Sequence, residues 1–521
     1  MSPPVTTAAS MLSCPYPWTP DQGDDTYRNP IVCADYSDPD VIRDGDDFWM
    51  TASSFNCTPG LPILHSRDLV NWTIVNHAVV NLPDPRKVYH EPQHGCGVWA
   101  PAIRKHNNKF WIFFPQVDEG IYVTTADDPR GTWSEPHMLV EGKGLIDPCP
   151  LWDDDGKAYV VHAYANSRAG IKHKLRVRPM APDGSKLLGE GQIVFDDPTN
   201  HPTLEGPKFH KRNGYYYISA PAGGVATGWQ VILRSRNVYG PYEPRIVLHQ
   251  GSTPINGPHQ GAIVDTPDGK EWWFIHFQEL QPYGRIVHLQ PMSWDNDWPV
   301  MGVNHNAQGV GQPVLAYRKP HIQKQAIAVP QTSDEFDQPK LALQWQWHAN
   351  HQDDWHTLTA RQSHLRLRAI SNPNDFSHAA NLLLQKTPGT RFSVETRAAL
   401  SPAADTDQAG LIIMGKTHAA LVIAPGPAHP QVLCIIDNRI VESHPLRNTE
   451  AVLRVSMNDG GVCSFSFAQS DEPPIRIEQT FQASEGRWIG AKVGIFCRCV
   501  SSEASKGHAD FDYFRFQSPA P

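Results

Sequence analysis

Apolar and polar positions alternate with a period of two through most of the 521-residue chain. In its first three-fifths, turns with Asp, Asn or Gly are followed repeatedly by aromatic-rich apolar runs, as in GDDFWMTASS (45–54) and NGYYYISAPAGG (213–224). Such turns between alternating runs are typical of antiparallel hairpins. No stretch has a convincing 3.6-residue period, so the pattern predicts an all-β protein.

The turn-and-strand unit recurs five times, and its starts are roughly 50–60 residues apart, longer than the unit of about 40–45 residues in a WD40 repeat. The five units are 45–54, 107–115, 155–164, 213–224 and 268–277. They predict a five-bladed β-propeller, a closed ring of sheets that leaves few strand edges exposed. An irregular two-sheet sandwich is the alternative.

The rhythm changes near residues 319–337, where KPHIQKQAIAVPQTSDEFD has no strand-turn pattern and is typical of a linker. Beyond it, alternating segments such as 391–400 and 509–516 predict a β-sandwich of the jelly-roll type. The expected organisation is an N-terminal extension (1–25), a propeller domain (26–320), a linker (321–332) and a sandwich domain (333–521).

Composition narrows the classes of partner. Lys and Arg number 45 against 54 Asp and Glu, a formal charge of −9, and there is no basic run, so a nucleic-acid partner is not expected. The hydrophobic content of 40% excludes a disordered chain. Because no uncharged apolar run approaches 20 residues, no membrane partner is expected either.

The cysteines and the N-terminus bear on the compartment. Nine cysteines are an odd number at irregular spacing with no CxxC pair, which favours free thiols in a reducing environment. The first residues, MSPPVTTAASMLSCPYPW, lack a basic n-region and an apolar h-region, so we expect no secretory signal. A cytoplasmic protein is expected, and a secreted protein whose leader has been removed is the alternative.

Three carboxylates near the starts of blades are candidates for chemistry, because ligands of propellers bind at one end of the central channel. They are Asp38 in ADYSDPDVIR, Asp147 in GKGLIDPCPLW and Glu205 in HPTLEGPKFH. Each is flanked by Pro or Gly and by bulky apolar residues, unlike the acids of the hairpin turns. A buried hydrogen-bonded strut is the structural alternative for any one of them.

The order and setting of these acids resemble glycoside hydrolase family 43, the five-bladed-propeller β-xylosidases and α-L-arabinofuranosidases. The resemblance covers nearly the whole chain, and the tail from Ser333 is similar to the concanavalin-like sandwich of xylosidase-type members. The motifs that carry it are NPIVCADYSDPDVIR, GVWAPAIRKHNNKFWIFF (97–114), GLIDPCPLWDDDGKAYVV (144–161), LEGPKFHKRNGYYYISAPAGG (204–224) and NGPHQGAIVDT (256–266).

By this resemblance Asp38 corresponds to the general base, Glu205 to the general acid, and Asp147 to the acid that raises the pKa of the proton donor and orients it. An inverting glycosidase needs a protonated carboxyl group beside the leaving oxygen and a carboxylate that activates water on the opposite face of the sugar. A like charge such as Asp147 beside the donor would keep that donor protonated.

The resemblance also implies sugar contacts. Phe55 and Trp99 correspond to aromatic walls of the pocket, Ile146 to a position that often holds a bulky apolar side chain, and Arg285 to an arginine that hydrogen-bonds sugar hydroxyls. Packing in the blade core is the alternative for the aromatic and aliphatic residues. A surface salt bridge is the alternative for Arg285.

His259 corresponds to a histidine that in many members coordinates a calcium ion or a water molecule below the sugar site. No protein carboxylate obviously joins it, so water would have to complete the shell of an ion that prefers oxygen ligands. A satisfied core histidine is the alternative. No organic cofactor is implied.

The expected function is that of an inverting exo-glycosidase releasing pentose from small xylan-type oligosaccharides. A β-xylosidase is the first interpretation and an α-L-arabinofuranosidase the second. The sandwich is expected to close one side of the pocket, and a homo-oligomer is left open. A non-catalytic carbohydrate-binding protein and a retaining fructan-cleaving propeller enzyme are less favoured, because all three acids are present and the stretch YSDPDVIR lacks the W-x-N-D-P-N-G-like start.

Overall fold

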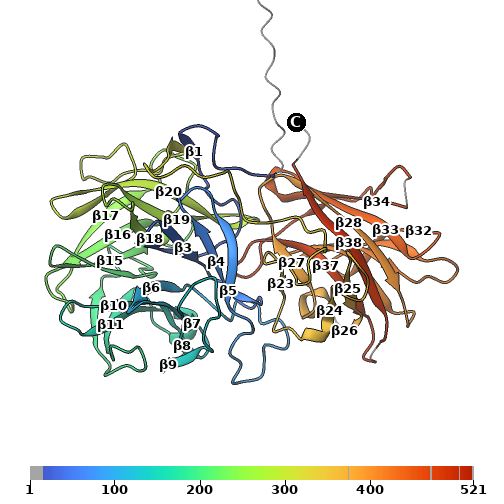
Figure 1. Cartoon of the computed structure of the whole chain (residues 1–521), viewed down its shortest axis with the longest axis horizontal. Coiled ribbons are helices and arrows are strands. Elements are labelled where there is room, and N and C mark those ends of the chain that lie inside the picture. The colour runs from blue at the N-terminus through green and yellow to red at the C-terminus, as the bar shows by residue number, and fades with distance from the viewer. Residues whose placement is uncertain (1–15, 374, 470–471, 504, 519–521) are drawn as a thin grey trace, which may run out of the picture.

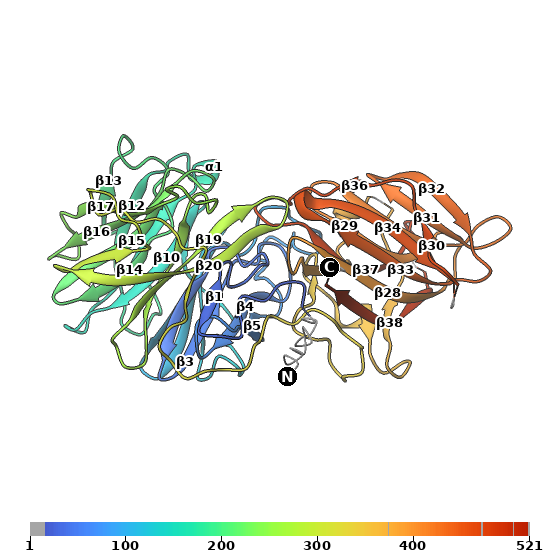
Figure 2. The same ribbon diagram turned by 90° about the horizontal axis from the view of Figure 1, so that it is seen from above.

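The structure is a computed structural model that describes residues 16–373, 375–469, 472–503 and 505–518. Figure 1 shows two lobes side by side, an N-terminal ring of small sheets and a C-terminal pair of stacked sheets, and Figure 2 gives the same arrangement from above. The described chain is almost entirely strand and loop. Its only α-helix is the short α1 (Asn166–Ala169), and three 3₁₀ turns lie at Asp353–Trp355, Phe376–His378 and Asp459–Gly461.

Five four-stranded antiparallel sheets make up the N-terminal lobe within the described residues, each built from consecutive strands. The strands of blades one and two are β2 (Asp40–Asp44), β3 (Asp47–Thr51), β4 (Gly60–Ser66), β5 (Thr73–Val79), β6 (Ala102–His106), β7 (Lys109–Gln116), β8 (Gly120–Ala126) and β9 (His137–Glu141). Those of blade three are β10 (Leu145–Trp152), β11 (Ala158–Tyr164), β12 (Lys174–Met180) and β13 (Gln192–Asp196). Blades four and five contain β14 (Lys208–Arg212), β15 (Tyr215–Ala222), β16 (Trp229–Ser235), β17 (Glu243–His249), β18 (His259–Asp265), β19 (Trp272–Leu280), β20 (Gly284–Asp295) and β21 (Trp298–Met301).

The turns between the first two strands of each blade explain why these segments fold as hairpins. In the turn between β14 and β15, Asn213 and Gly214 have φ angles of 50° and 71°. Asn and Gly adopt this left-handed conformation at low cost, and its twist suits a two-residue hairpin loop. The hairpins predicted from these turns are therefore present in the fold.

Three contacts close the ring. The short strand β1 (Thr26–Arg28) pairs with β22 (Ala316–Arg318), so that the two ends of the propeller segment meet. A bridge between Val32 and Val287 joins the chain before the first blade to the fifth blade, and β2 packs against β18. The predicted five-bladed propeller is confirmed.

Two eight-stranded sheets form the sandwich in the part of the chain that the structure describes. One sheet contains β23 (Gln346–Trp347), β26 (Ile370–Ser371), β27 (Leu383–Lys386), β29 (Asp407–Met414), β30 (His418–Ala424), β31 (Gln431–Ile436), β32 (Arg439–Pro445) and β37 (Lys492–Cys499). The other contains β24 (His356–Thr357), β25 (Leu365–Arg368), β28 (Phe392–Ser401), β33 (Glu450–Met457), β34 (Val462–Ala468), β35 (Ile475–Arg476), β36 (Phe481–Gln482) and β38 (His508–Gln517). Buried and half-buried positions alternate along β28 and β33, which confirms the predicted sandwich.

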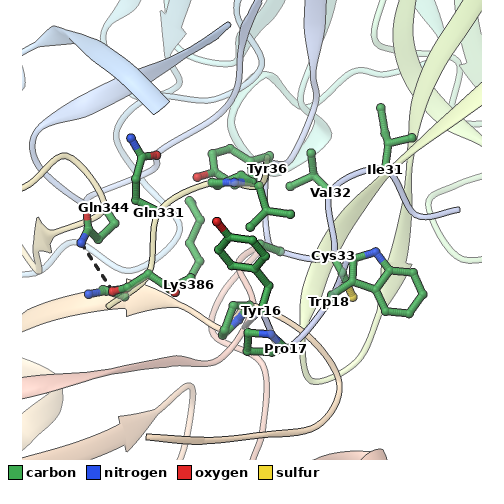
Figure 3. Close-up of a pocket in the computed structure, with 16 residues that line it drawn as sticks. Tyr16, Pro17, Trp18, Ile31, Val32, Cys33, Tyr36, Gln331, Gln344 and Lys386 are labelled. Carbon is green, nitrogen blue, oxygen red and sulfur yellow. Dashed lines mark hydrogen bonds between the residues drawn. The ribbon is translucent and has the colours of Figure 1, made fainter. Parts of the chain in front are cut away.

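The interface between the lobes contains a small cavity, shown in Figure 3. The segment from Tyr16 to Trp18, the start of the first blade, residues 329–332 and the end of β27 contribute its lining. The Lys386 ammonium lies 5.0 Å from the centre of the Tyr36 ring. Burial and the nearby Lys492 lower the pKa of Lys386 to about 8. The lobes are thus packed through polar as well as apolar groups.

Two further sequence expectations concern the cysteines and membrane-spanning segments. The eight cysteines among the described residues form no disulfide, and Cys14 lies outside those residues. No helix in the described ranges is long and apolar enough to cross a membrane. The exact domain boundaries stay predictions.

Candidate active site

A cavity of about 440 Å³ lies where the innermost strands of the propeller begin, and all eight predicted site residues line it. Their side chains come from segments far apart in the sequence, so only the ring of blades brings them together. They are Asp38, Phe55, Trp99, Ile146, Asp147, Glu205, His259 and Arg285. The three predicted acids therefore meet in one place, from blades one, three and four.

Asp38 lies just before β2 and is almost fully buried, with 5% of its surface exposed. Its Oδ2 accepts hydrogen bonds of 2.6 Å from the hydroxyls of both Ser37 and Ser53. The Arg285 guanidinium is 3.3 Å from Oδ1. These donors hold the Asp38 carboxyl group in one orientation, which a residue that positions an attacking water molecule requires.

Asp147 sits in β10 at a break in the strand register. Pairing with β11 shifts between Ile146 and Cys149, and a bulge of this kind redirects the side chain at its centre. Burial and the neighbouring carboxylates of Glu205 and Asp38 raise the pKa of Asp147 to about 8. The Gly206 amide, which donates to Asp147 Oδ2 over 2.7 Å, only partly opposes this shift. The surroundings of Asp147 therefore favour its protonated form.

Glu205 precedes β14 and is the most accessible of the three acids, because 30% of its side-chain surface is exposed in the cavity. Its backbone amide donates to the carbonyl of Pro221 over 3.1 Å, which fixes the segment against the next strand. Oε1 lies 3.2 Å from Nε2 of His259. The carboxyl group is thus oriented from one side and open to a ligand on the other.

His259 is buried at the start of β18, with 1% of its surface exposed. Its second ring nitrogen, Nδ1, has no hydrogen-bond partner among the described residues, so the predicted ion or a water molecule would bind there. Within the same residues, no group of three or more His, Cys, Asp or Glu side chains could hold a metal ion. Protein ligands for calcium at His259 are therefore few, and the ion stays a prediction.

Arg285 lies in β20 and joins two parts of the site. Its Nη1 donates to Ser37 Oγ over 2.9 Å and lies next to the Asp38 carboxylate, while its backbone amide donates to Asp35 over 2.9 Å. The guanidinium also lies over the Phe277 ring, 4.9 Å from its centre. Arg285 is therefore held in the cavity wall and does not form a salt bridge at the protein surface.

Aromatic rings form one wall of the cavity. The ring centres of Phe55 and Trp99 are 6.3 Å apart, and Trp99 is an equal distance from Trp488 in an edge-to-face arrangement. Trp99 is fixed by the hydrogen bond from its indole N–H to the carbonyl of Gly95. Such faces pack against the C–H surface of a sugar and exclude water.

The sandwich contributes Trp488, which sequence reasoning missed. This residue follows β36 on a loop between strands, nearly 400 residues after Trp99, and no pattern around GRWIG indicated a role. The sandwich therefore supplies one side chain to the wall of the cavity, and its closing of that side stays a prediction. Ser37 and Ser53 were also missed, although Ser37 is adjacent to Asp38 in the motif.

Backbone conformation marks the same residues. Asp38, Phe55 and Asp147 have φ angles of 55°, 51° and 56°, in the left-handed region that residues with a side chain rarely adopt. Strain of this kind is commonly retained at functional sites, where the surrounding structure enforces it. It supports the cavity as the functional site on grounds independent of charge.

Comparison with known proteins identifies the family. The sequence profile described as glycosyl hydrolases family 43 matches residues 27–299, just over half of the chain. The chain belongs to glycosyl hydrolase family 43. A second profile, described as the beta xylosidase C-terminal concanavalin A-like domain, matches residues 333–517 of this family-43 enzyme. The resemblance noted in the motifs is confirmed, and the chain is a glycoside hydrolase that hydrolyses glycosidic bonds.

Curated relatives of the family-43 enzyme carry two kinds of name. A putative beta-xylosidase of Xylanibacter ruminicola is 44% identical over 76% of this chain and 72% of its own. A beta-xylosidase of Formosa agariphila is 30% identical over 96% and 92% of the two chains. A non-reducing end alpha-L-arabinofuranosidase of Bacteroides ovatus is 27% identical over 94% and 95%.

Solved structures of the family share the two-domain fold. A structure from Bacteroides ovatus, described as xyloglucan PUL GH43B, has a TM-score of 0.80 and 25% identity and covers 95% of this chain and 100% of its own. A bifunctional GH43-CE structure from Bacteroides eggerthii has a TM-score of 0.82 and 25% identity over 95% of this chain. The family-43 enzyme spans 64% of the length of that second protein.

Proposed function

We propose that this enzyme is an inverting exo-glycosidase that releases single pentose units from xylan-type oligosaccharides, with β-xylosidase activity. The observation that carries the proposal is the convergence of Asp38, Asp147 and Glu205 from three blades in one aromatic-walled cavity. The names of the relatives from Xylanibacter and Formosa support the choice of xylose.

In the proposed reaction, Asp38 acts as the general base. Its carboxylate, held in place by Ser37, Ser53 and Arg285, takes a proton from a water molecule as the water oxygen attacks the anomeric carbon of the sugar. The bond from that carbon to the leaving oxygen breaks at the same time. Attack on the opposite face from the leaving group inverts the anomeric configuration.

Glu205 delivers a proton to the leaving oxygen. Asp147 and Glu205 are two neighbouring carboxyl groups, and two like charges in a buried site are costly, so the pair retains a proton at neutral pH. Glu205 is the more exposed of the two and therefore the one that can reach the substrate. The hydrogen-bond distance to His259 Nε2 keeps the Glu205 carboxyl group oriented. No step depends on a metal ion.

The second candidate is α-L-arabinofuranosidase activity, favoured by the name of the relative from Bacteroides ovatus, whose similarity extends over 94% of this chain. The two sugars are nearly superimposable around the bond that breaks. A single hydroxyl contact in the cavity can therefore decide between them.

The experiment that tests the proposal is paired hydrolysis. The purified enzyme is assayed with 4-nitrophenyl β-D-xylopyranoside and 4-nitrophenyl α-L-arabinofuranoside, and then with xylobiose, xylotriose and arabino-oligosaccharides. We expect the highest kcat/KM on the β-xyloside and xylose as the first product of xylotriose. Turnover of neither aryl glycoside would contradict the proposed function.

A further inference from the structure

Asp35 joins the two domains beside the active site although it does not line the cavity. It precedes the general-base candidate Asp38 by three residues and is buried, with 2% of its surface exposed. Oδ1 accepts the backbone N–H of Arg285 over 2.9 Å, and Oδ2 accepts the backbone N–H of Gly490 over 3.0 Å. One carboxylate therefore holds a propeller strand and a sandwich loop at once.

Both hydrogen bonds of Asp35 hold backbone that carries, or lies close to, a residue lining the cavity. Arg285 carries the guanidinium that contacts Ser37 and Asp38. Gly490 lies two residues after Trp488, which supplies the sandwich's part of the aromatic wall. The Asp35 carboxylate thus sets the position of Arg285 relative to Trp488, two groups that reach the cavity from different domains.

The packing around this junction leaves little freedom. A Cβ atom on Gly284 would lie 2.6 Å from the Asp35 carboxyl carbon and 2.7 Å from the Cα of Gly490. A Cβ on Gly490 would lie 2.2 Å from the carbonyl oxygen of Tyr283. The Ala491 amide adds a further hydrogen bond of 2.7 Å to the carbonyl of Pro282. The backbone around Gly284 therefore packs directly against the backbone around Gly490, and the Asp35 carboxylate lies at this contact.

We propose that Asp35 is a positioning residue, whose carboxylate fixes the Arg285 segment and the Trp488 loop against each other so that both side chains are held in place around the substrate. This inference rests on the proposed function. A displacement of either segment would act on the reaction, because small misplacements of positioning groups reduce rates strongly.

Asp35→Asn is the test variant, because it keeps the size of the side chain but replaces one accepting oxygen with an N–H₂ group that cannot accept from an amide. Gln331→Ala is the matched control. The Gln331 side chain makes two hydrogen bonds between the segment that connects the domains and blade one, with the amide and carbonyl of Ile74, and it does not line the catalytic cavity.

Hydrogen–deuterium exchange of the full-length proteins provides a readout that does not need activity. We expect Asp35→Asn to increase exchange in residues 484–491 and 281–286, and Gln331→Ala to increase it near residue 74 only. Unchanged exchange in both junction segments of Asp35→Asn would overturn the inference, even if the enzyme proved inactive on every pentoside tested.

Kinetics provide the second readout. We expect Asp35→Asn to lower kcat/KM on xylobiose roughly tenfold, with Gln331→Ala close to the wild type. The loss should fall on kcat more than on KM, because a displaced Arg285 no longer holds Asp38 in position for the attack by water. A loss confined to KM, or equal losses in both variants, would overturn the positioning role, whereas an inactive wild type would overturn the proposed function instead.

Discussion

The backbone amide of Gly206 donates a hydrogen bond to Oδ2 of Asp147 over 2.7 Å, and so ties a carboxyl group of blade three to the residue that follows Glu205 in blade four. This contact holds two acidic side chains of different blades next to each other. Burial and the neighbouring Glu205 carboxyl group raise the pKa of Asp147, so that the pair favours a bound proton, and in the proposed reaction Glu205 delivers this proton to the leaving oxygen.

The proposed base gives the first prediction. Asp38→Asn should lower kcat on 4-nitrophenyl β-D-xylopyranoside by roughly 10²–10⁴-fold, because a good leaving group removes the need for an acid but not for a base. Steady-state kinetics measure the loss. Asp153→Asn is the control, since Asp153 is an equally buried carboxylate that contacts Lys211 and Tyr216 outside the cavity. Comparable activity of the two variants would reject the assignment of Asp38.

The proposed acid, Glu205, gives the second prediction. Glu205→Ala should lose turnover of xylobiose by a factor of roughly 10²–10⁴ and lose much less on aryl xylosides whose leaving group needs no proton. The measurement is the ratio of kcat/KM between the two substrates. Binding of xylose, followed by calorimetry, should be largely preserved. An equal loss on both substrates would show that Glu205 does not act as the proton donor.

The raised pKa of Asp147 predicts a dependence of stability on pH. The folded state holds the proton up to about pH 8, whereas the unfolded chain releases it near the ordinary value of 3.8. Between these values the unfolded state binds fewer protons, so the contribution of Asp147 to the free energy of unfolding falls as pH rises and levels off above 8. The melting temperature of Asp147→Asn minus that of the wild type should therefore become more positive from pH 5 to pH 8.

Lys386 does not interfere with that measurement. Its pKa is lowered to about 8 in the folded state, below its ordinary value of 10.5, so its contribution to stability rises with pH only above about 8. A difference between Asp147→Asn and the wild type that stays constant from pH 5 to pH 8 would contradict the raised pKa of Asp147.

Trp488 should affect the binding of the substrate in the cavity. Trp488→Ala should raise KM for xylobiose and lower kcat/KM roughly tenfold, because an aromatic wall of the cavity is lost, while Trp488→Phe should restore most of the activity. Trp272→Ala is the control, since Trp272 packs against Trp294 away from the cavity. Unchanged kinetics in Trp488→Ala would mean that the sandwich only shields the site.

Features of this protein that depend on residues close together in the sequence could be predicted from it, and features that depend on residues far apart could not. Local turn chemistry at positions such as Asn213 and Gly214 indicated the hairpins, and the short motifs around Asp38, Asp147 and Glu205 were sufficient to find the acids. Each of these signals is contained in a stretch of about ten consecutive residues.

Contacts between the domains left no such signal. Asp35 and Gly490 are 455 residues apart, and their hydrogen bond exists only because the two domains pack together. Trp488 reaches the cavity for the same reason. The raised pKa of Asp147 likewise depends on burial and on charges from other blades, which no local pattern contains.

Proton NMR of the first product formed from 4-nitrophenyl β-D-xylopyranoside tests the central claim most directly, since it reports on how water reaches the anomeric carbon. In the proposed reaction, a water molecule bound to Asp38 attacks on the face opposite the leaving group, which Glu205 protonates. The first product must then be α-xylose, which slowly mutarotates to the equilibrium mixture. Initial appearance of β-xylose would contradict the account.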